Sequence, residues 1–194
     1  MNNSETIRTF IAIELSEEVK TALRSLQSRL KSVSPNTAKW VDPGSIHLTL
    51  KFLGETRLSL ITPITAVLDN IAKNIPPFTL SVTESGAFPD LRRVQVVWVG
   101  LTGDLIPLNR LQKEVESAIS PLGFPTEKRL FVPHLTLARV RDTATLSDRQ
   151  NLGALISRTK LEGALRLTVD SVNFMQSRLT PGGAIYTKLH SSQL

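Results

Sequence analysis

The tetrapeptide His-Leu-Thr-Leu occurs twice in this chain, at residues 47–50 and 134–137. The chain has three histidines, and two of them open these copies. Leucines that alternate with polar residues are typical of a half-buried β-strand, in which residues i and i+2 share one face. The repeat therefore predicts two strands that turn their leucines toward a core. Each strand then presents one imidazole and one hydroxyl on its other face.

Composition limits the class of protein. The chain has 194 residues, 41% of them hydrophobic and 21% charged, which is typical of a soluble globular domain. It contains no cysteine, which excludes disulfides and thiolate metal sites. Residues 1–8 are polar, and no apolar run approaches the roughly 18 residues of a membrane span. We therefore expect neither a signal peptide nor a membrane segment, and a cytoplasmic location.

The charge balance favours anionic partners. The formal net charge is +6 and the sequence pI is about 10.0, which favours nucleic acid, although a solvated basic surface is the plain alternative. Four cations flank the second tetrapeptide, and Arg92 and Arg93 form another pair. The flanking cations are Lys128, Arg129, Arg139 and Arg141. A phosphate group is therefore favoured near the second copy.

Hydrophobic periodicity predicts both strands and helices. The expected strands are residues 8–15, 46–53, 78–82, 94–99, 131–138, 165–174 and 184–189. The expected helices are residues 16–30, 58–74, 104–119 and 146–158. Residues 86–93 are expected to form a loop and residues 180–183 a turn, and Pro133 indicates a strand start or an edge strand.

Both halves of the chain combine strands, a helix and a His-Leu-Thr-Leu strand. This predicts an α+β fold of two similar lobes, with antiparallel or mixed sheets flanked by helices. No long linker separates the halves, so residues 1–194 are expected to form one domain. A symmetric pair of lobes would place the motif strands across a central cleft.

Two imidazoles and two hydroxyls suit one kind of chemistry. An imidazole has a pKa of about 6.5, so near neutral pH one can be protonated while the other is neutral, as a general acid and a general base require. Phosphodiester cleavage needs both, and threonine hydroxyls with a nearby arginine can hold the phosphate oxygens. A 2′,3′-cyclic phosphate fits because its ring is strained. A metal site is disfavoured because no acidic residue or cysteine stands at ligand spacing, and His190 is expected to be incidental.

The chain resembles the 2H phosphoesterase superfamily, whose hallmark is a pair of His-x-Thr-x motifs. It is most similar to the bacterial and archaeal RNA 2′,3′-cyclic phosphodiesterases, also called 2′-5′ RNA ligases. The resemblance covers nearly the whole chain. It includes residues 8–13, 39–41, 47–55, 97–101, 133–139, 177–179 and 183–186.

The resemblance implies a bilobal fold and hydrolysis of RNA 2′,3′-cyclic phosphate ends to 2′-phosphates without a metal or cofactor. His47 is then the proton donor and His134 the proton acceptor. Thr49 and Thr136 bind the phosphate, and Arg139 matches an arginine that contacts it. An RNA end is the implied partner, with no obligate protein partner.

The resemblance leaves the role of several side chains undecided. Phe52 or Phe131 is a candidate to stack a base, although a place in the core is favoured for both. Tyr186 and Ser177 are expected to be structural. Val132 departs from the pattern, since relatives often carry a basic residue there, which removes one expected phosphate contact.

Three alternatives remain. The same site suits 2′-5′-linked oligonucleotides or small cyclic nucleotides, and weak reverse ligation of a cyclic-phosphate end to a 5′-hydroxyl is possible. A non-catalytic RNA-binding module would use the basic surface alone, but it has no need for two such histidines.

Overall fold

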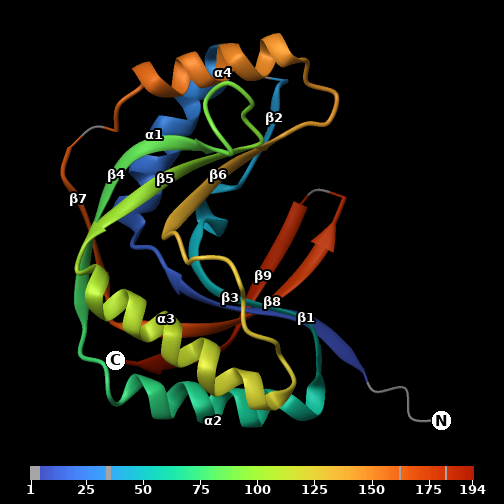
Figure 1. The fold of residues 1–194 in the computed structure, drawn as a ribbon, viewed down its shortest axis with the longest axis vertical. Coiled ribbons are helices and arrows are strands. Elements are labelled where there is room, and N and C mark those ends of the chain that lie inside the picture. The colour runs from blue at the N-terminus through green and yellow to red at the C-terminus, as the bar shows by residue number, and fades with distance from the viewer. Residues whose placement is uncertain (1–4, 34–35, 162, 182) are drawn as a thin grey trace.

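The computed structural model describes residues 5–33, 36–161, 163–181 and 183–194 (Figure 1). This part of the chain forms two β-sheets and four α-helices. The helices are α1 (Glu17–Val33), α2 (Ile61–Ala72), α3 (Leu105–Ile119) and α4 (Leu146–Arg158). The α+β class predicted from the sequence is confirmed.

The first sheet, here the terminal sheet, has the strand order β3-β1-β8-β9. Its strands are β1 (Thr6–Glu14), β3 (His47–Arg57), β8 (Ser171–Thr180) and β9 (Gly183–Gln193). The second sheet, here the central sheet, has the order β2-β6-β5-β4-β7. Its strands are β2 (Ala38–Trp40), β4 (Phe78–Phe88), β5 (Val96–Gly103), β6 (His134–Val140) and β7 (Leu165–Val169). Every recorded strand pairing is antiparallel, so neither sheet is mixed.

Each sheet draws strands from both halves of the chain, so a lobe is not a half of the sequence. The terminal sheet joins β1 and β3 to the C-terminal hairpin β8–β9, and the central sheet joins β2 and β4 to β6 and β7. Helices α2 and α3 pack against the terminal sheet, while α1 and α4 pack against the central sheet (Figure 1).

One continuous core joins the two sheets. Buried residues of the terminal sheet, such as Ile11 and Leu48, belong to the same cluster as Val97 and Leu135 of the central sheet. The helices add stripes of residues spaced three or four apart, as in α1 with Val19, Leu23, Leu26 and Leu30. A smaller cluster of Phe10, Ala12 and Met175 lies on the other face of the terminal sheet.

Some predicted element boundaries are wrong. The single strand expected at residues 165–174 is two strands, β7 and β8, which separate at Asp170 and enter different sheets. The expected loop at 86–93 is shorter, since β4 continues through Phe88. The strand expected from Phe131 begins at His134, so Pro133 marks the strand start. It does not mark an edge, because β6 has β2 on one side and β5 on the other. Position 182 of the expected turn lies outside the described residues.

Candidate active site

The two His-Leu-Thr-Leu copies form the first residues of β3 and β6, and these two strands contact each other although they belong to different sheets. Leu48 and Leu135 are fully buried, whereas His47 and His134 are half-buried. Thr49 and Thr136 share the half-buried face of their histidines. The alternation predicted from the repeat is confirmed, and the contact of β3 with β6 brings the two copies into one region.

Both imidazoles are held in the same way. His47 Nδ1 lies 2.8 Å from the carbonyl oxygen of Ser45, and His134 Nδ1 lies 2.7 Å from that of Val132. A carbonyl oxygen only accepts hydrogen bonds, so each Nδ1 carries a proton and donates it. Each ring therefore leaves Nε2 as the atom that can take up or release a proton.

Local sequence places these carbonyls two residues before each histidine. Before His47, residues 43–45 form a 3₁₀ turn whose N-cap is Asp42, and the Asp42 side chain accepts a hydrogen bond from Gly44 N at 2.7 Å. Before His134, Pro133 biases Val132 toward an extended conformation. A capped 3₁₀ turn in one case and a proline in the other thus precede the same contact, a carbonyl oxygen against Nδ1 of the imidazole.

A β-bulge lies at the last residue of the tetrapeptide in both strands. Leu50 of β3 and Leu137 of β6 are each skipped in the pairing register with β1 and β5. The next residues, Lys51 and Ala138, stay buried. An extra residue reverses the alternation of faces beyond it.

As a result, the fifth residue after each histidine returns to the face of that histidine. These residues are Phe52 and Arg139. Phe52 is 68% exposed, so the prediction that it belongs to the core is wrong. Strict alternation would have turned Arg139 toward the core, and the bulge is what exposes it.

Aromatic rings surround the two imidazoles. Phe10 of β1 stacks on His47 with ring centroids 4.6 Å apart, and Tyr186 of β9 meets the same imidazole edge-on at 5.1 Å. Phe88 of β4 meets His134 edge-on at 5.0 Å. No sequence signal pointed to Phe10 or Phe88, because only the sheet pairing brings β1 and β4 to the motif strands. Tyr186 was expected to be structural, yet it contacts a candidate catalytic ring.

Burial and charge act differently on the site's titratable groups. Burial lowers the pKa of His47, while the Ser45 hydrogen bond and the negative charge of Glu14 oppose that shift. Glu14 is the residue of β1 opposite His47, and it forms an ion pair with Lys188 of β9. Burial raises the pKa of Tyr186, and the positive charges of Arg139 and Arg8 oppose it.

The positive charges of two arginines act on Tyr186, although these arginines belong to different sheets. Arg8 lies in β1 and Arg139 in β6, and both side chains are exposed. Sequence reasoning did not single out Arg8. Two cations beside a half-buried phenol favour the binding of an anion.

The threonine hydroxyls are available to a ligand. Neither Thr49 nor Thr136 hydrogen-bonds through its side chain to another residue in the described part of the chain. Among these same residues, no group of three or more histidine, cysteine or acidic side chains is arranged to hold a metal ion.

The remaining candidates lie elsewhere. His190 Nε2 contacts Asp69 of α2 at 2.7 Å, away from the motif residues. Phe131 packs partly against the core, and Val132 contributes its carbonyl to His134. Ser177 pairs with Tyr186 across the β8–β9 hairpin. In the described residues, no helix is both long and apolar enough to cross a membrane.

The fold and the paired histidines define a phosphoesterase of the 2H class. The sequence model of the LigT-like phosphoesterases matches residues 13–98 and 103–186, and the chain belongs to this family.

Individual relatives cover almost the whole chain. It is 31% identical over 188 residues to the RNA 2′,3′-cyclic phosphodiesterase of Methanothermobacter thermautotrophicus, covering 97% of this chain and 99% of the relative. A crystal structure from Thermus thermophilus superposes with a TM-score of 0.81 at 27% identity, covering 97% and 98% of the two chains. The E. coli LigT structure complexed with 3′-AMP gives 0.78 at 25% identity, covering 98% and 99%.

Proposed function

We propose that this protein hydrolyses 2′,3′-cyclic phosphodiester ends of RNA to 2′-phosphomonoesters by acid–base catalysis with two histidines. The observation that carries the proposal is the matching anchor of His47 and His134. Both rings donate through Nδ1, so both Nε2 atoms are left for proton transfer, on two strands that contact each other. Relatives of similar length are named RNA 2′,3′-cyclic phosphodiesterases, which supports the substrate class.

The proposed reaction moves two protons. Nε2 of neutral His134 takes a proton from a water molecule as the water oxygen bonds to phosphorus. The bond from phosphorus to the 3′ oxygen breaks, and Nε2–H of protonated His47 gives that oxygen its proton. The products are a 2′-phosphate and a free 3′-hydroxyl. A 5′-hydroxyl of a second RNA in place of water, acting on the same bonds, would give weak ligation.

We assign the phosphate to the hydroxyls of Thr49 and Thr136, with Arg139 and Arg8 neutralising its charge. Both hydroxyls stand two residues after their histidine on the same face of the strand. Donors fixed before the reaction stabilise charge that develops on the phosphate oxygens. No metal or cofactor takes part in the proposed steps.

The direction of the reaction fixes the side on which the nucleoside binds. In an in-line displacement the leaving 3′ oxygen lies opposite the attacking water, so the ribose stands on the side of His47. The terminal sheet on this side carries Phe52, whose ring centroid is 6.2 Å from that of Phe10. An exposed aromatic face is a platform on which any nucleobase can stack. We therefore assign the terminal base to Phe52.

The lowered pKa of His47 opposes its role as a proton donor in the free protein. A cyclic phosphate carries a negative charge, and a negative charge close to an imidazole favours its protonated form. Glu14 acts in the same direction. We therefore propose that substrate binding favours the protonated form of His47.

We further propose that residues 1–194 act as one domain in which the two sheets form two lobes around the site. The core cluster that spans both sheets supports this. An RNA end is the only partner that the proposal requires, and a cytoplasmic location suits RNA processing.

The proposal is tested with a short RNA that ends in a 2′,3′-cyclic phosphate, incubated with the protein in EDTA and followed by phosphorus NMR. The expected product is a 2′-phosphate, formed by the wild type but not by His47→Ala or His134→Ala. His190→Ala serves as the matched control and is expected to keep activity, because His190 contacts Asp69 instead of the site. Unchanged substrate with folded protein would reject the proposal.

A further inference from the structure

Basic side chains gather around the C-terminal end of β6, beyond the proposed phosphate site. We call Lys39, Arg93, Arg141 and Arg149 the β6 patch. Lys39 of β2 is paired with Arg139 of β6, and Arg141 N donates to Thr37 O at 2.9 Å. These links place Lys39 beside Arg139 and Arg141 directly after the end of β6, while Arg93 lies in the loop before β5 and Arg149 in α4.

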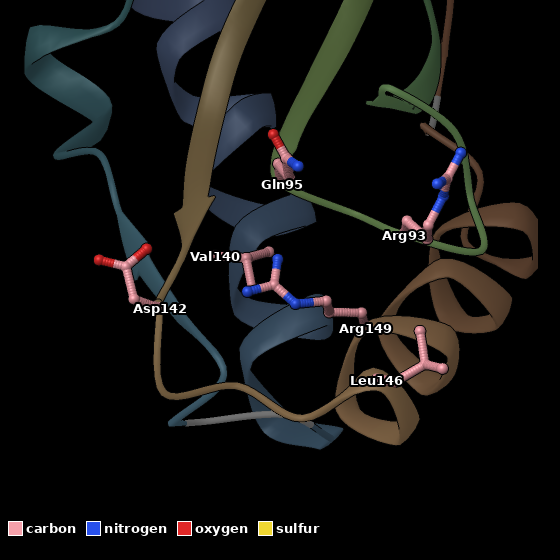
Figure 2. A pocket seen from close by; sticks show the side chains of 6 residues that line it. All are labelled: Arg93, Gln95, Val140, Asp142, Leu146 and Arg149. Carbon is pink, nitrogen blue, oxygen red and sulfur yellow. The ribbon is translucent and has the colours of Figure 1, made fainter.

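The loop before β5 completes the patch. Val140 N donates to Gln95 O at 2.8 Å, and a pocket of about 470 Å³ opens beside these residues. Arg93 and Gln95 line it from the loop, and Leu146 and Arg149 line it from α4 (Figure 2). The pocket thus joins the end of β6 to two neighbouring segments.

The positive charge of the patch is only partly compensated. Arg149 donates to three backbone carbonyls, Val94 O at 2.8 Å, Arg141 O at 3.0 Å and Ala144 O at 3.3 Å. These carbonyls satisfy its N–H groups without cancelling its charge.

Acidic side chains are few around this surface. Arg93 has an exposed ion pair with Asp90 at 3.5 Å, and Asp142 lines the pocket. Within the described ranges, Lys39 and Arg141 form no ion pair, and both side chains are exposed. An extended polyanion can therefore replace water and counterions there.

We propose that the β6 patch binds the phosphodiester backbone of single-stranded RNA on the 5′ side of the cyclic end. This inference rests on the proposed function. The patch begins at Lys39, the pairing partner of Arg139, and continues past the end of β6, which at roughly 3.3 Å per residue lies about 20 Å along the strand from His134. The substrate is then an RNA chain several nucleotides long, and a cyclic mononucleotide uses only part of the surface.

The test compares the double variant Lys39→Gln/Arg141→Gln with the wild type on two substrates. One is a 2′,3′-cyclic mononucleotide, and the other is an oligoribonucleotide ending in the same cyclic nucleotide. Lys73→Gln/Lys113→Gln is the matched control, since it removes two exposed positive charges from α2's end and from α3. Fluorescence anisotropy of a labelled oligoribonucleotide measures binding separately from turnover.

The patch variant is expected to bind the oligoribonucleotide about tenfold more weakly, with a salt slope reduced by about 1.4 for two lost phosphate contacts. Its kcat/KM for the oligoribonucleotide should fall in parallel, while that for the mononucleotide stays unchanged.

Oligoribonucleotide binding that is equal in the patch variant, the control and the wild type would overturn the inference. Absence of hydrolysis in every variant would reject the proposed function instead. The anisotropy result would still decide whether the patch binds RNA.

Discussion

Residues 52 and 139 occupy the same place in the two motif strands, and they carry chemically different side chains. Each is the fifth residue after its histidine and returns to the site face through a bulge. A site built from two copies of one motif has no intrinsic polarity for its substrate. In the proposed function, Phe52 and Arg139 supply that polarity, with a stacking face on the strand of His47 and a cation on the strand of His134.

Replacement of Phe52 tests the base platform. Phe52→Ala is expected to raise KM for cyclic nucleotides about tenfold, because base stacking on an aromatic ring contributes roughly 1–3 kcal/mol. Phe52→Trp should restore KM. A ribose 2′,3′-cyclic phosphate without a base should be hydrolysed equally by wild type and Phe52→Ala. Ile106→Ala, an exposed apolar side chain on α3, is the control. An unchanged KM in Phe52→Ala would exclude the platform.

The pH dependence tests the charge of His47. A proton donor must be protonated, so kcat/KM, which reports the free protein, falls as pH rises through the pKa of His47. Burial lowers that pKa, so the fall should come below about pH 6.5, the ordinary imidazole value. The bound phosphate raises it, so kcat should fall at a higher pH than kcat/KM. Glu14→Gln should move the fall in kcat/KM to still lower pH. Coincident falls in kcat and kcat/KM would contradict the role of the phosphate.

At the residue scale, the repeat was enough to predict that the histidines and threonines share one half-buried face and that the leucines face the core. It was not enough to predict Phe52 on the surface or Arg139 on the face of the histidine. Both positions depend on an extra residue in the pairing register, which is decided by the neighbouring strand.

Among the elements, a buried ion pair joins β3 to α3, and hydrogen bonds extend it to the segment before β6. Lys51 Nζ lies 2.5 Å from Glu116 Oε2 of α3 and donates to Pro125 O at 2.8 Å. The same carboxylate oxygen accepts from Glu127 N at 3.2 Å. This network links the residue after the first tetrapeptide to the chain that leads into the second.

Removal of one partner should be costly. Lys51→Met leaves the Glu116 carboxylate buried without its cation, with an expected loss of about 3 kcal/mol in the free energy of unfolding. Lys51→Met/Glu116→Gln removes both charges and should recover much of this loss, as measured by urea denaturation. Lys113→Met, an exposed site on α3, should stay within about 0.5 kcal/mol of wild type. A Lys51→Met protein as stable as the control would show that the pair contributes little.

Helices were predicted more reliably than strand ends. The apolar stripes at three- and four-residue spacing identified all four helices, because this periodicity is a local property. The split of residues 165–174 into β7 and β8 was missed, because apolar residues continue through both segments. Only their pairing with β4 and with β1 separates them.

For the whole molecule, the shared core makes the two sheets mutually dependent. The chain passes between the sheets repeatedly, since β2 stands between β1 and β3 and the strands β4 to β7 stand between β3 and β8. Buried side chains of both sheets form one cluster. Two sheets built in this way are expected to unfold together.

The prediction of joint unfolding can be checked with local probes. Trp40 and Trp98 lie in the central sheet, and Tyr186, the one tyrosine of the sequence, lies in the terminal sheet. Tryptophan fluorescence and the ring NMR signals of Tyr186 should give the same urea midpoint. Two separate midpoints would show that the sheets unfold as independent units.

Strand order could not be predicted from the sequence. Two halves of similar pattern suggested two lobes of consecutive chain, whereas the sheets exchange strands between the halves. Pairing between segments that are far apart in the sequence depends on the tertiary structure, which local sequence patterns do not determine.

The central claim is that His47 protonates the leaving 3′ oxygen while His134 activates water. It is tested most directly with a 2′,3′-cyclic substrate whose 3′ bridging oxygen is replaced by sulfur, because a thiolate leaves without a proton. His47→Ala should hydrolyse this substrate at close to the wild-type rate, and His134→Ala should stay inactive on it. Rescue of His134→Ala instead would reverse the two roles, and rescue of neither variant would contradict the acid–base assignment.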